Sequence, residues 1–379
     1  MDSFQTNTLT HSDKGQEVKA IYKNKHFIPF DHIRRGSALF QSIAPYLTPG
    51  KLFNLLNCER EKLQRKTVQH SVPYIAIIDV SNRCNLRCPY CPTGSKRKSG
   101  RDKKTIDLSH IERLLSDVGT YLISANLFNW GEPFLHPQIC KVVKMFHEDH
   151  VATHISSNFN SLNKELIEET SQSGLDYLTV SLSGISQEVY QQYHRGGKID
   201  IVTENIKHLV ACKRKYNKKR PIIEWKYLLF KHNIHEVEKA REISSKLGVD
   251  IFRIVRGGGE EQATINKSEA PRSFKGTRVC HQLWHTVVIN ADGAIPPCCN
   301  LFFRQDDFGA YREQGISQIR NNEVFLTARK LFNPSMIDQL DTKLVHPCLK
   351  CELVHKQPHL REYLKSNPNA KLSHRTGGP

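Results

Sequence analysis

Three cysteines, Cys84, Cys88 and Cys91, stand close together in the sequence with the spacing C-x3-C-x2-C. They follow an apolar stretch, residues 74–80, and lie among asparagines and arginines. Thiolates are the usual protein ligands of iron–sulfur clusters, and close spacing lets one loop wrap around a cluster. Three thiolates leave one iron of a four-iron cluster without a protein ligand, and a reactive metal centre needs such an open position. A zinc knuckle that takes its fourth ligand from elsewhere is the alternative.

A second set of cysteines has the spacing of another metal site. Cys280 is followed after twelve residues by Gly293 and then by Cys298, and the C-x2-C pair Cys348 and Cys351 closes the set. Residues 287–298 (VVINADGAIPPC) predict a small hairpin with an Asp-Gly turn, which would bring the first two thiols together. A structural zinc site is the alternative. The adjacent Cys299 could also replace Cys298 as a ligand.

Alternating strands and helices would position these loops. β-Branched and apolar runs predict strands, and the stretches between them show helical periodicity. This alternation predicts an α/β fold with a parallel sheet and right-handed crossovers. Six units instead of eight indicate a partial (β/α)6 TIM-like barrel, followed by a small cysteine-rich module. The predicted strands are residues 74–80, 122–128, 151–156, 177–183, 222–229 and 250–255.

The composition changes along the chain predict four parts. Residues 1–71 form an N-terminal, mostly helical extension, and residues 72–262 form the barrel. Residues 263–356 form the auxiliary-cluster module, and residues 357–379 are a basic flexible tail. Ligands of such sheets bind at the carboxyl ends of the strands. The chemistry-bearing motifs should therefore follow strands.

The first cysteine set, with Tyr90 just before the third cysteine, resembles the cluster motif of the radical S-adenosylmethionine (radical SAM) superfamily. The resemblance implies a 4Fe–4S cluster whose open iron binds S-adenosylmethionine (SAM). Reduction would cleave SAM to a 5′-deoxyadenosyl radical, which abstracts a substrate hydrogen, so no protein side chain is predicted as the catalytic group.

The same resemblance implies the SAM contacts. Residues 129–133 (NWGEP) resemble the family's GGEP segment, with Asn-Trp-Gly in place of the more usual Thr-Gly-Gly. Polar turns after the third and fourth strands, and the segment 193–197 (YHRGG), resemble further SAM-binding segments. The implied SAM-binding residues are Tyr90, Gly131, Glu132, Ser157, Asn158, Ser181, Ser183 and Arg195.

The second cysteine set resembles the SPASM module or its shorter relative, Twitch. The resemblance implies one auxiliary 4Fe–4S cluster held by Cys280, Cys298, Cys348 and Cys351, because no cysteine follows for a second cluster. A fully ligated cluster can accept an electron. We therefore expect two-electron oxidation (dehydrogenation) of a sugar, cyclitol or similar polar metabolite. A maturase of a ribosomally made peptide or protein is the runner-up, and a non-enzymatic zinc-dependent RNA-binding protein is a third possibility.

The charge and hydropathy of the sequence limit the kinds of molecule that the protein is expected to bind. Lys and Arg number 55 against 38 Asp and Glu, a formal net charge of +17. Together with the basic residues 96–104, which could also be a solvated loop, this charge is compatible with a small polar or anionic substrate. No apolar run could span a membrane, and the polar N-terminus predicts no secretory signal, so we expect a cytoplasmic protein. An external one-electron donor such as flavodoxin or ferredoxin is expected, and neither a membrane nor a nucleic acid is. The substrate carbon, and whether SAM is consumed or regenerated, stay open.

Overall fold

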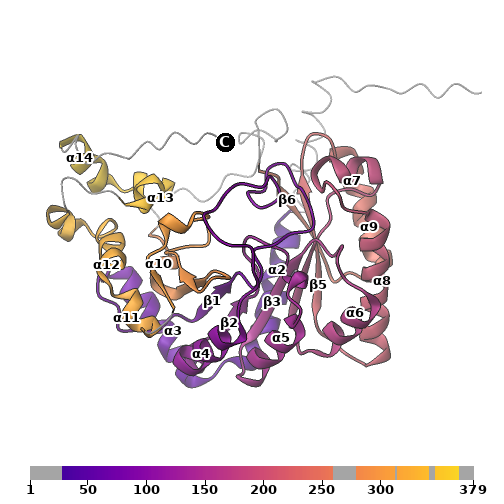
Figure 1. Cartoon of the computed structure of the whole chain (residues 1–379), viewed down its shortest axis with the longest axis horizontal. Helices are drawn as coiled ribbons and strands as arrows, with labels where there is room; N and C mark the ends of the chain where they lie inside the picture. Colours follow the sequence, from indigo (N-terminus) through magenta and orange to yellow (C-terminus); the bar gives the residue numbers. More distant parts are fainter. Residues whose placement is uncertain (1–27, 259–278, 312–313, 341–345, 367–379) are drawn as a thin grey trace, which may run out of the picture. The chain divides into compact units, whose positions relative to one another are not determined.

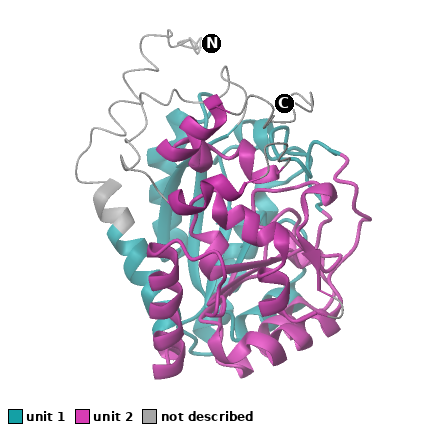
Figure 2. Ribbon diagram, turned by 90° about the vertical axis from the view of Figure 1, so that its left-hand side faces the viewer, with its two compact units in different colours: residues 1–44, 84–97, 155–274 teal, residues 45–83, 98–154, 275–379 magenta. Residues whose placement is uncertain are grey.

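The computed structural model describes residues 28–258, 279–311, 314–340 and 346–366. The chain divides into two compact units, each built from several stretches of sequence (Figure 2). Unit 1 contains residues 1–44, 84–97 and 155–274, and unit 2 contains residues 45–83, 98–154 and 275–379. The division into four contiguous parts at residues 71, 262 and 356 stays a prediction from the sequence.

Seven strands form one sheet in the order β6-β5-β4-β3-β2-β1-β7 (Figure 1). Each pair with a defined register is parallel. This confirms the predicted α/β class. The strands are β1 (Ile75–Ile78), β2 (Ser124–Asn126), β3 (Ala152–Ser157), β4 (Tyr177–Ser181), β5 (Ile222–Leu229), β6 (Ile251–Arg256) and β7 (Thr286–Ile289).

In unit 1, the strands have two different faces. Along β5, Trp225 and Tyr227 alternate with Glu224 and Lys226. The two aromatic side chains are at most 1% exposed, whereas Lys226 is partly exposed. Because alternate residues of a strand point to opposite faces, one face is apolar and the other carries polar groups. The helices of this unit are α2 (Ile28–Ile43), α6 (Lys164–Gln172), α7 (Gln187–Tyr193), α8 (Ile199–Lys215) and α9 (Val237–Leu247).

The helices of unit 1 begin and end where side chains satisfy their free backbone groups. The Asn163 side chain accepts from the Leu166 N–H at the start of α6, and Ser186 caps α7 in the same way. Gly248 ends α9 with a φ of +79°, a left-handed conformation that glycine adopts without a steric penalty.

Unit 2 contains β1, β2, β7 and a larger number of short elements. Ile111, Leu114 and Val118 form the buried stripe of α4, which matches the helical periodicity of the sequence. The helices are α3 (Pro49–Leu63), α4 (Leu108–Val118), α5 (Ile139–Glu148), α10 (Gln282–His285), α11 (Ile316–Arg320), α12 (Glu323–Lys330), α13 (Glu352–His355) and α14 (Pro358–Ser366).

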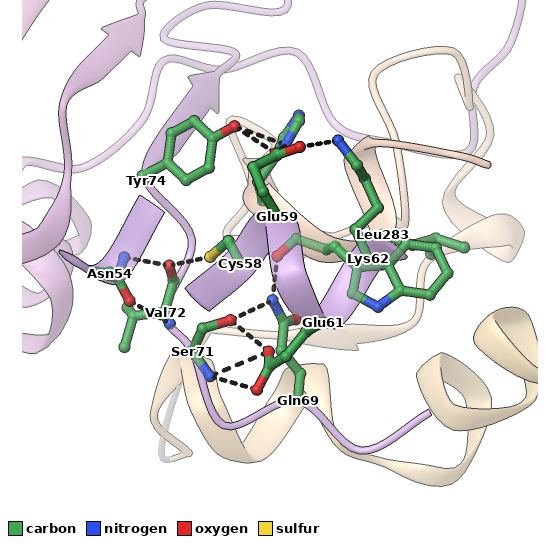
Figure 3. A network of polar contacts seen from close by, with 12 residues as sticks. Asn54, Cys58, Glu59, Glu61, Lys62, Gln69, Ser71, Val72, Tyr74 and Leu283 are labelled. Atoms are coloured by element: carbon green, nitrogen blue, oxygen red, sulfur yellow. Dashed lines mark hydrogen bonds and ion pairs between the residues drawn. The ribbon is translucent and has the colours of Figure 1, made fainter. Parts of the chain in front are cut away.

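Helix α3 is fastened to the segment that leads into β1 (Figure 3). Asn54 pairs with both backbone groups of Val72, at 2.8 and 3.0 Å. The Cys58 thiol donates to the Val72 carbonyl at 3.1 Å, and the Tyr74 hydroxyl donates to Glu59 at 2.9 Å. Cys58 is fully buried, so it is a structural thiol of this contact.

The predicted hairpin over residues 287–298 is wrong in its pairing. The turn forms, with Gly293 at a φ of +77°. However, β7 pairs in parallel with β1, and β8 (Ala294–Ile295) pairs antiparallel with β9 (Gly309–Ala310). The apolar residues of β7 are buried at the edge of the main sheet, which offers them more contacts than an isolated hairpin would.

The region expected to be a flexible tail contains a helix. Leu360 of α14 is fully buried, and the Tyr363 hydroxyl donates to the Leu340 carbonyl at 3.2 Å. Residues 367–379 lie outside the described part. Among the described residues, none of the helices combines the length and apolarity needed to cross a bilayer.

Candidate functional site

The loop that carries the first three cysteines lies in unit 1 and is tightly wound. Backbone N–H groups of Cys91 and Ser95 donate to the carbonyls of Cys88 and Cys91 at 3.3 and 2.8 Å. A Cβ on Gly94 would lie 2.6 Å from the Cys88 nitrogen, so only glycine fits there. Burial, and then the charges of Cys91 and Cys84, raise the pKa of Cys88 to about 12. Three thiols so close together need a positively charged partner to be ionised, and the iron of a cluster fits that need.

Aromatic and amide groups surround this loop within unit 1. Tyr193 stacks near Tyr90 and Phe230, with ring centroids 6.3 and 4.8 Å apart. Burial and the neighbouring thiolates raise the pKa of Tyr193, which places its ring beside the cysteines. The Asn158 amide approaches the Cys84 sulfur at 3.8 Å and donates to the Asn85 side chain at 2.9 Å. The cysteine loop is therefore packed against aromatic rings, and the Asn158 amide lies near one of its sulfur atoms.

The segment 129–133 forms a turn in unit 2 against the strand exit that leads to Cys84. Asp79 is 2% exposed, and its Oδ1 accepts the N–H groups of Trp130 and Gly131 at 3.1 and 3.2 Å. The Glu132 N–H donates to the Arg83 carbonyl at 2.7 Å. A Cβ on Gly131 would lie 1.8 Å from the Ser81 carbonyl oxygen, so this approach requires glycine. Asp79 was not singled out in the sequence, although it directly follows the buried residues of β1.

The predicted SAM contacts of the fourth strand and its loop differ in their surroundings. Ser181 ends β4 and is partly exposed. Ser183 is fully buried, and its hydroxyl contacts the His194 ring and accepts the Leu228 N–H, both at 3.1 Å. Arg195 is exposed, and its backbone carbonyl accepts from Arg87. Thus Ser181 and Arg195 have accessible surface, whereas Ser183 already has two protein partners.

His194 is a buried residue that sequence reasoning passed over in favour of Arg195. Its burial, followed by the charge of Lys226, lowers its pKa to about 3, so the ring is neutral. The only signal in the sequence was its place within YHRGG. Of the remaining predicted contacts, Ser157 and Glu132 are buried and accept the N–H groups of Phe159 and Phe134, respectively.

The polar face of β4, β5 and β6 gathers charged groups. Glu224 is paired in register with Thr179 and Ile251, and Lys226 with Ser181 and Arg253. Glu224 forms ion pairs with Arg35 at 2.8 Å and Arg253 at 2.7 Å. These arginines outweigh the cost of burial and lower the pKa of Glu224 to about 2.

The second cysteine set is brought together within unit 2. Burial raises the pKa of Cys348 well above its usual value, and the charges of Cys298, Cys280 and Cys351 raise it further. Burial also raises the pKa of Cys298 to about 12, with contributions from Cys280, Cys299 and Cys351. These thiols are therefore close neighbours. No three metal-binding side chains of the described residues surround a single metal position. Each thiolate of a cubane binds its own iron, so the donor set is compatible with a cluster.

The thiol of Cys299 has a partner of its own. The Gln282 amide donates to the Cys299 sulfur at 3.3 Å, and its oxygen accepts the Cys299 N–H at 3.0 Å. After burial, the cysteine charges that raise the pKa of Cys348 most are those of Cys298, Cys280 and Cys351. Cys298 therefore stays the predicted ligand, and Cys299 the alternative.

One residue of the basic segment 96–104, Arg101, forms ion pairs with protein carboxylates. The Arg101 guanidinium is 3% exposed and pairs with Asp292 at 2.9 Å and with Asp307 at 2.5 Å. The Arg101 guanidinium therefore links the segment after the cysteine loop to the turn at Asp292 and to the residue Asp307, which precedes β9. Arg101 is therefore occupied by protein carboxylates, and an anionic substrate would have to use other cations.

Comparisons with known proteins agree with this geometry. Residues 78–220 match the model of the Radical SAM superfamily, and residues 280–352 match the model of SPASM, an iron–sulfur cluster-binding domain. The chain is 27% identical over 130 residues to GTP 3′,8-cyclase of Limosilactobacillus fermentum, covering 34% of this chain and 39% of that protein. It is 24% identical over 140 residues to PqqA peptide cyclase of Bradyrhizobium diazoefficiens, covering 35% of this chain and 36% of that one.

The chain thus spans less than half the length of these curated relatives. Among solved structures it is similar to Streptococcus suis SuiB bound to S-adenosylmethionine, with a TM-score of 0.55 and 16% identity. That likeness covers 78% of this chain and 74% of SuiB, and it supports the partial TIM-like barrel with a C-terminal module. The chain is therefore a radical SAM superfamily enzyme with a C-terminal SPASM domain, and S-adenosylmethionine and iron–sulfur clusters are its cofactors.

Proposed function

We propose that this enzyme dehydrogenates a small polar metabolite, such as a sugar or cyclitol, and that its auxiliary cluster accepts an electron from the substrate. The observation that carries the substrate class is the face of β4, β5 and β6 that carries Ser181, Lys226 and Arg253, each partly exposed, opposite a face that is apolar and buried on β4 and β5. A polar substrate finds hydrogen-bonding partners on such a face, whereas an apolar one would leave them unsatisfied. The reducing electron for SAM comes from an external donor such as flavodoxin or ferredoxin.

Cys84, Cys88 and Cys91 hold the SAM-binding cluster in this proposal, because they share one tight loop and one electrostatic environment. When bound, the cluster and SAM supply the one-electron chemistry that removes a hydrogen atom from a C–H bond. Around them, Tyr90, Tyr193 and Phe230 exclude water from the loop.

The turn at residues 129–133 orients the cofactor. Asp79 fixes the backbone of Trp130 and Gly131, and this leaves Glu132 next to the strand exit. By the resemblance, Gly131 and Glu132 would hold the methionyl amine of SAM, and the remaining predicted residues would contact other parts of it. These are Tyr90, Ser157, Asn158, Ser181, Ser183 and Arg195, of which Ser183 is the least accessible.

Cys280, Cys298, Cys348 and Cys351 hold one auxiliary cluster with four protein thiolates. A cluster with a full set of protein ligands has no iron free to bind substrate, so its role is electron transfer. Removal of a hydrogen atom from a carbinol carbon leaves a radical, which must lose its hydroxyl proton to solvent and one further electron before a ketone forms. The auxiliary cluster accepts that electron.

A peptide maturase is the competing function. One of the similar proteins is named PqqA peptide cyclase, and SuiB has a similar fold. Maturases often carry a domain of mixed strands and helices before the barrel. Here the described residues before β1, 28–74, contain the helices α2 and α3 and no strand. This absence, within the described part, favours the small-molecule substrate.

Anaerobic reconstitution tests the proposal. We expect about eight irons per chain if two 4Fe–4S clusters form, and 5′-deoxyadenosine after addition of dithionite and SAM. Cys91→Ala should abolish that product, whereas Cys348→Ala should retain some SAM cleavage. A panel of sugars and cyclitols is compared with ribosomal precursor peptides. Turnover of a peptide alone would overturn the substrate class, and unchanged substrate oxidation by Cys348→Ala would overturn the electron-accepting role.

A further inference from the structure

The ammonium group of Lys226 lies on the polar face of unit 1 next to a hydroxyl group. Lys226 is in register with Ser181 on β4 and with Arg253 on β6. Its Nζ donates to the Ser156 hydroxyl at 3.2 Å. Residues in register on neighbouring parallel strands share a face. Lys226 therefore lies beside Ser181, one of the proposed SAM contacts.

The surroundings of Lys226 carry more positive than negative charge. Glu224 is the carboxylate on this stretch of β5, and both of its oxygens are used. One accepts from Arg35 and the Tyr177 hydroxyl, at 2.8 and 2.7 Å, and the other from Arg253 and the Thr179 hydroxyl, at 2.8 and 3.3 Å. Lys226 itself forms no ion pair with any described residue.

Other titratable groups near Lys226 do not supply the missing negative charge. His194 is held neutral by its burial, as its low pKa shows. Burial, and then the charge of Arg253, lower the pKa of Lys226 to about 8, although Glu224 opposes them. Three cations, Arg35, Lys226 and Arg253, thus face one carboxylate. A bound anion would relieve the repulsion and would gain a charge-assisted hydrogen bond.

We propose that Lys226, with the hydroxyl of Ser156, binds an anionic group of the substrate, either a carboxylate or a phosphate. This proposal rests on the proposed function and specifies its substrate as an anionic metabolite. The SAM carboxylate has another candidate partner in Arg195, whose exposed guanidinium forms no hydrogen bond or ion pair with a described residue. Lys226 is therefore available for the substrate.

Isothermal titration of the full-length, reconstituted protein tests the proposal, with inorganic phosphate and acetate as probes and SAM present. We expect one of the two anions to bind the wild type at least about tenfold more tightly than it binds Lys226→Met, because the charge-assisted bond is lost. Lys226→Arg keeps the charge and should keep most of the binding. Preference for phosphate indicates a phosphate ester, and preference for acetate indicates a carboxylate.

Controls separate this subsite from general charge and from SAM binding. Lys239→Met removes the same charge from exposed α9 of the same unit and should leave anion binding unchanged. Thermal unfolding and iron content establish that Lys226→Met is folded. Equal anion affinity in wild type and Lys226→Met would overturn the proposal, and so would a comparable loss of SAM affinity in Lys226→Met. Failure to form 5′-deoxyadenosine would instead refute the proposed function, because the anion titration does not depend on turnover.

Discussion

With its side-chain amide turned so that both polar atoms are satisfied, Asn129 donates a hydrogen bond to the backbone carbonyl of Cys299 at 3.2 Å and accepts one from the Trp130 indole at 3.0 Å. The Trp130 ring also meets Phe302 edge-on, with centroids 5.0 Å apart. Asn129 and Trp130 are the positions where the turn departs from the more usual Thr-Gly-Gly. These departures therefore join the proposed SAM-binding turn to the loop that carries Cys298.

Replacing Asn129 with Ala should loosen this loop. A lost hydrogen bond of about 1 kcal/mol corresponds to roughly fivefold more frequent opening. We therefore expect Cys299 to react about five times faster with iodoacetamide, as measured by mass spectrometry. Asn205→Ala is a matched control, since Asn205 also donates its amide to a backbone carbonyl, that of Phe159. An equal rate in wild type and Asn129→Ala would contradict the contact.

Serine substitutions at the two adjacent cysteines should have different effects on iron content. Cys298 interacts electrostatically with Cys280 and Cys351, whereas the Cys299 sulfur is held by Gln282. Cys298→Ser should lose about four irons per chain, the content of one cubane. Cys299→Ser should keep its full complement. The reverse result in iron and sulfide analysis would exchange the roles of the two residues.

Asp79 should control SAM affinity through the backbone of the turn. Asp79→Ala removes the acceptor of two partly buried N–H groups, and each lost hydrogen bond costs about 0.5–1.5 kcal/mol. The Kd for SAM should therefore rise at least about tenfold. Asp79→Asn keeps an acceptor oxygen and should stay close to the wild type. Equilibrium binding of SAM to the reconstituted variants measures this, and equal affinity in all three proteins would exclude the positioning role.

The stabilisation contributed by the buried carboxyl groups of Asp79 and Asp307 should fall as the pH rises towards neutrality. Burial raises the pKa of Asp79 from 3.8 to about 7, despite the N–H groups that it accepts, and raises that of Asp307 to about 6. The folded protein then binds more protons than the unfolded chain between about pH 4 and 7, so the stabilisation is present at low pH and is lost through this range. For Asp79 the shift corresponds to about 4 kcal/mol.

Thermal unfolding as a function of pH checks this expectation. Asp79→Asn is neutral throughout, so the stability of the wild type relative to this variant should decrease between pH 4 and 7. The lowered pKa values of Glu224, about 2, and of His194, about 3, affect the profiles of both proteins equally and cancel in this comparison. Parallel profiles for the two proteins would mean that Asp79 is already ionised in the folded state at low pH.

The elements of the barrel were largely predictable, because each carries its own periodic signal. The strand predicted at residues 222–229 coincides with β5, and the strand predicted at 250–255 lies within one residue of β6. The buried face of α4 also follows its apolar spacing. The wrong prediction concerns a strand whose partner is distant in the sequence. The local pattern predicts a hairpin for β7, and nothing local indicates that β7 pairs with β1, more than two hundred residues earlier.

The sequence by itself determined the chemistry: two sets of closely spaced thiols, the polar turns after the strands and the strand–helix alternation, since these depend on residue type and short spacing. Tertiary structure alone decided which groups are occupied and which stay available. It paired Arg101 with two aspartates, buried His194 against Ser183, and placed no counter-ion for Lys226 among the residues that the structure describes. The physical reason is that burial and charge pairing depend on groups brought together from distant parts of the chain, and no local pattern encodes them.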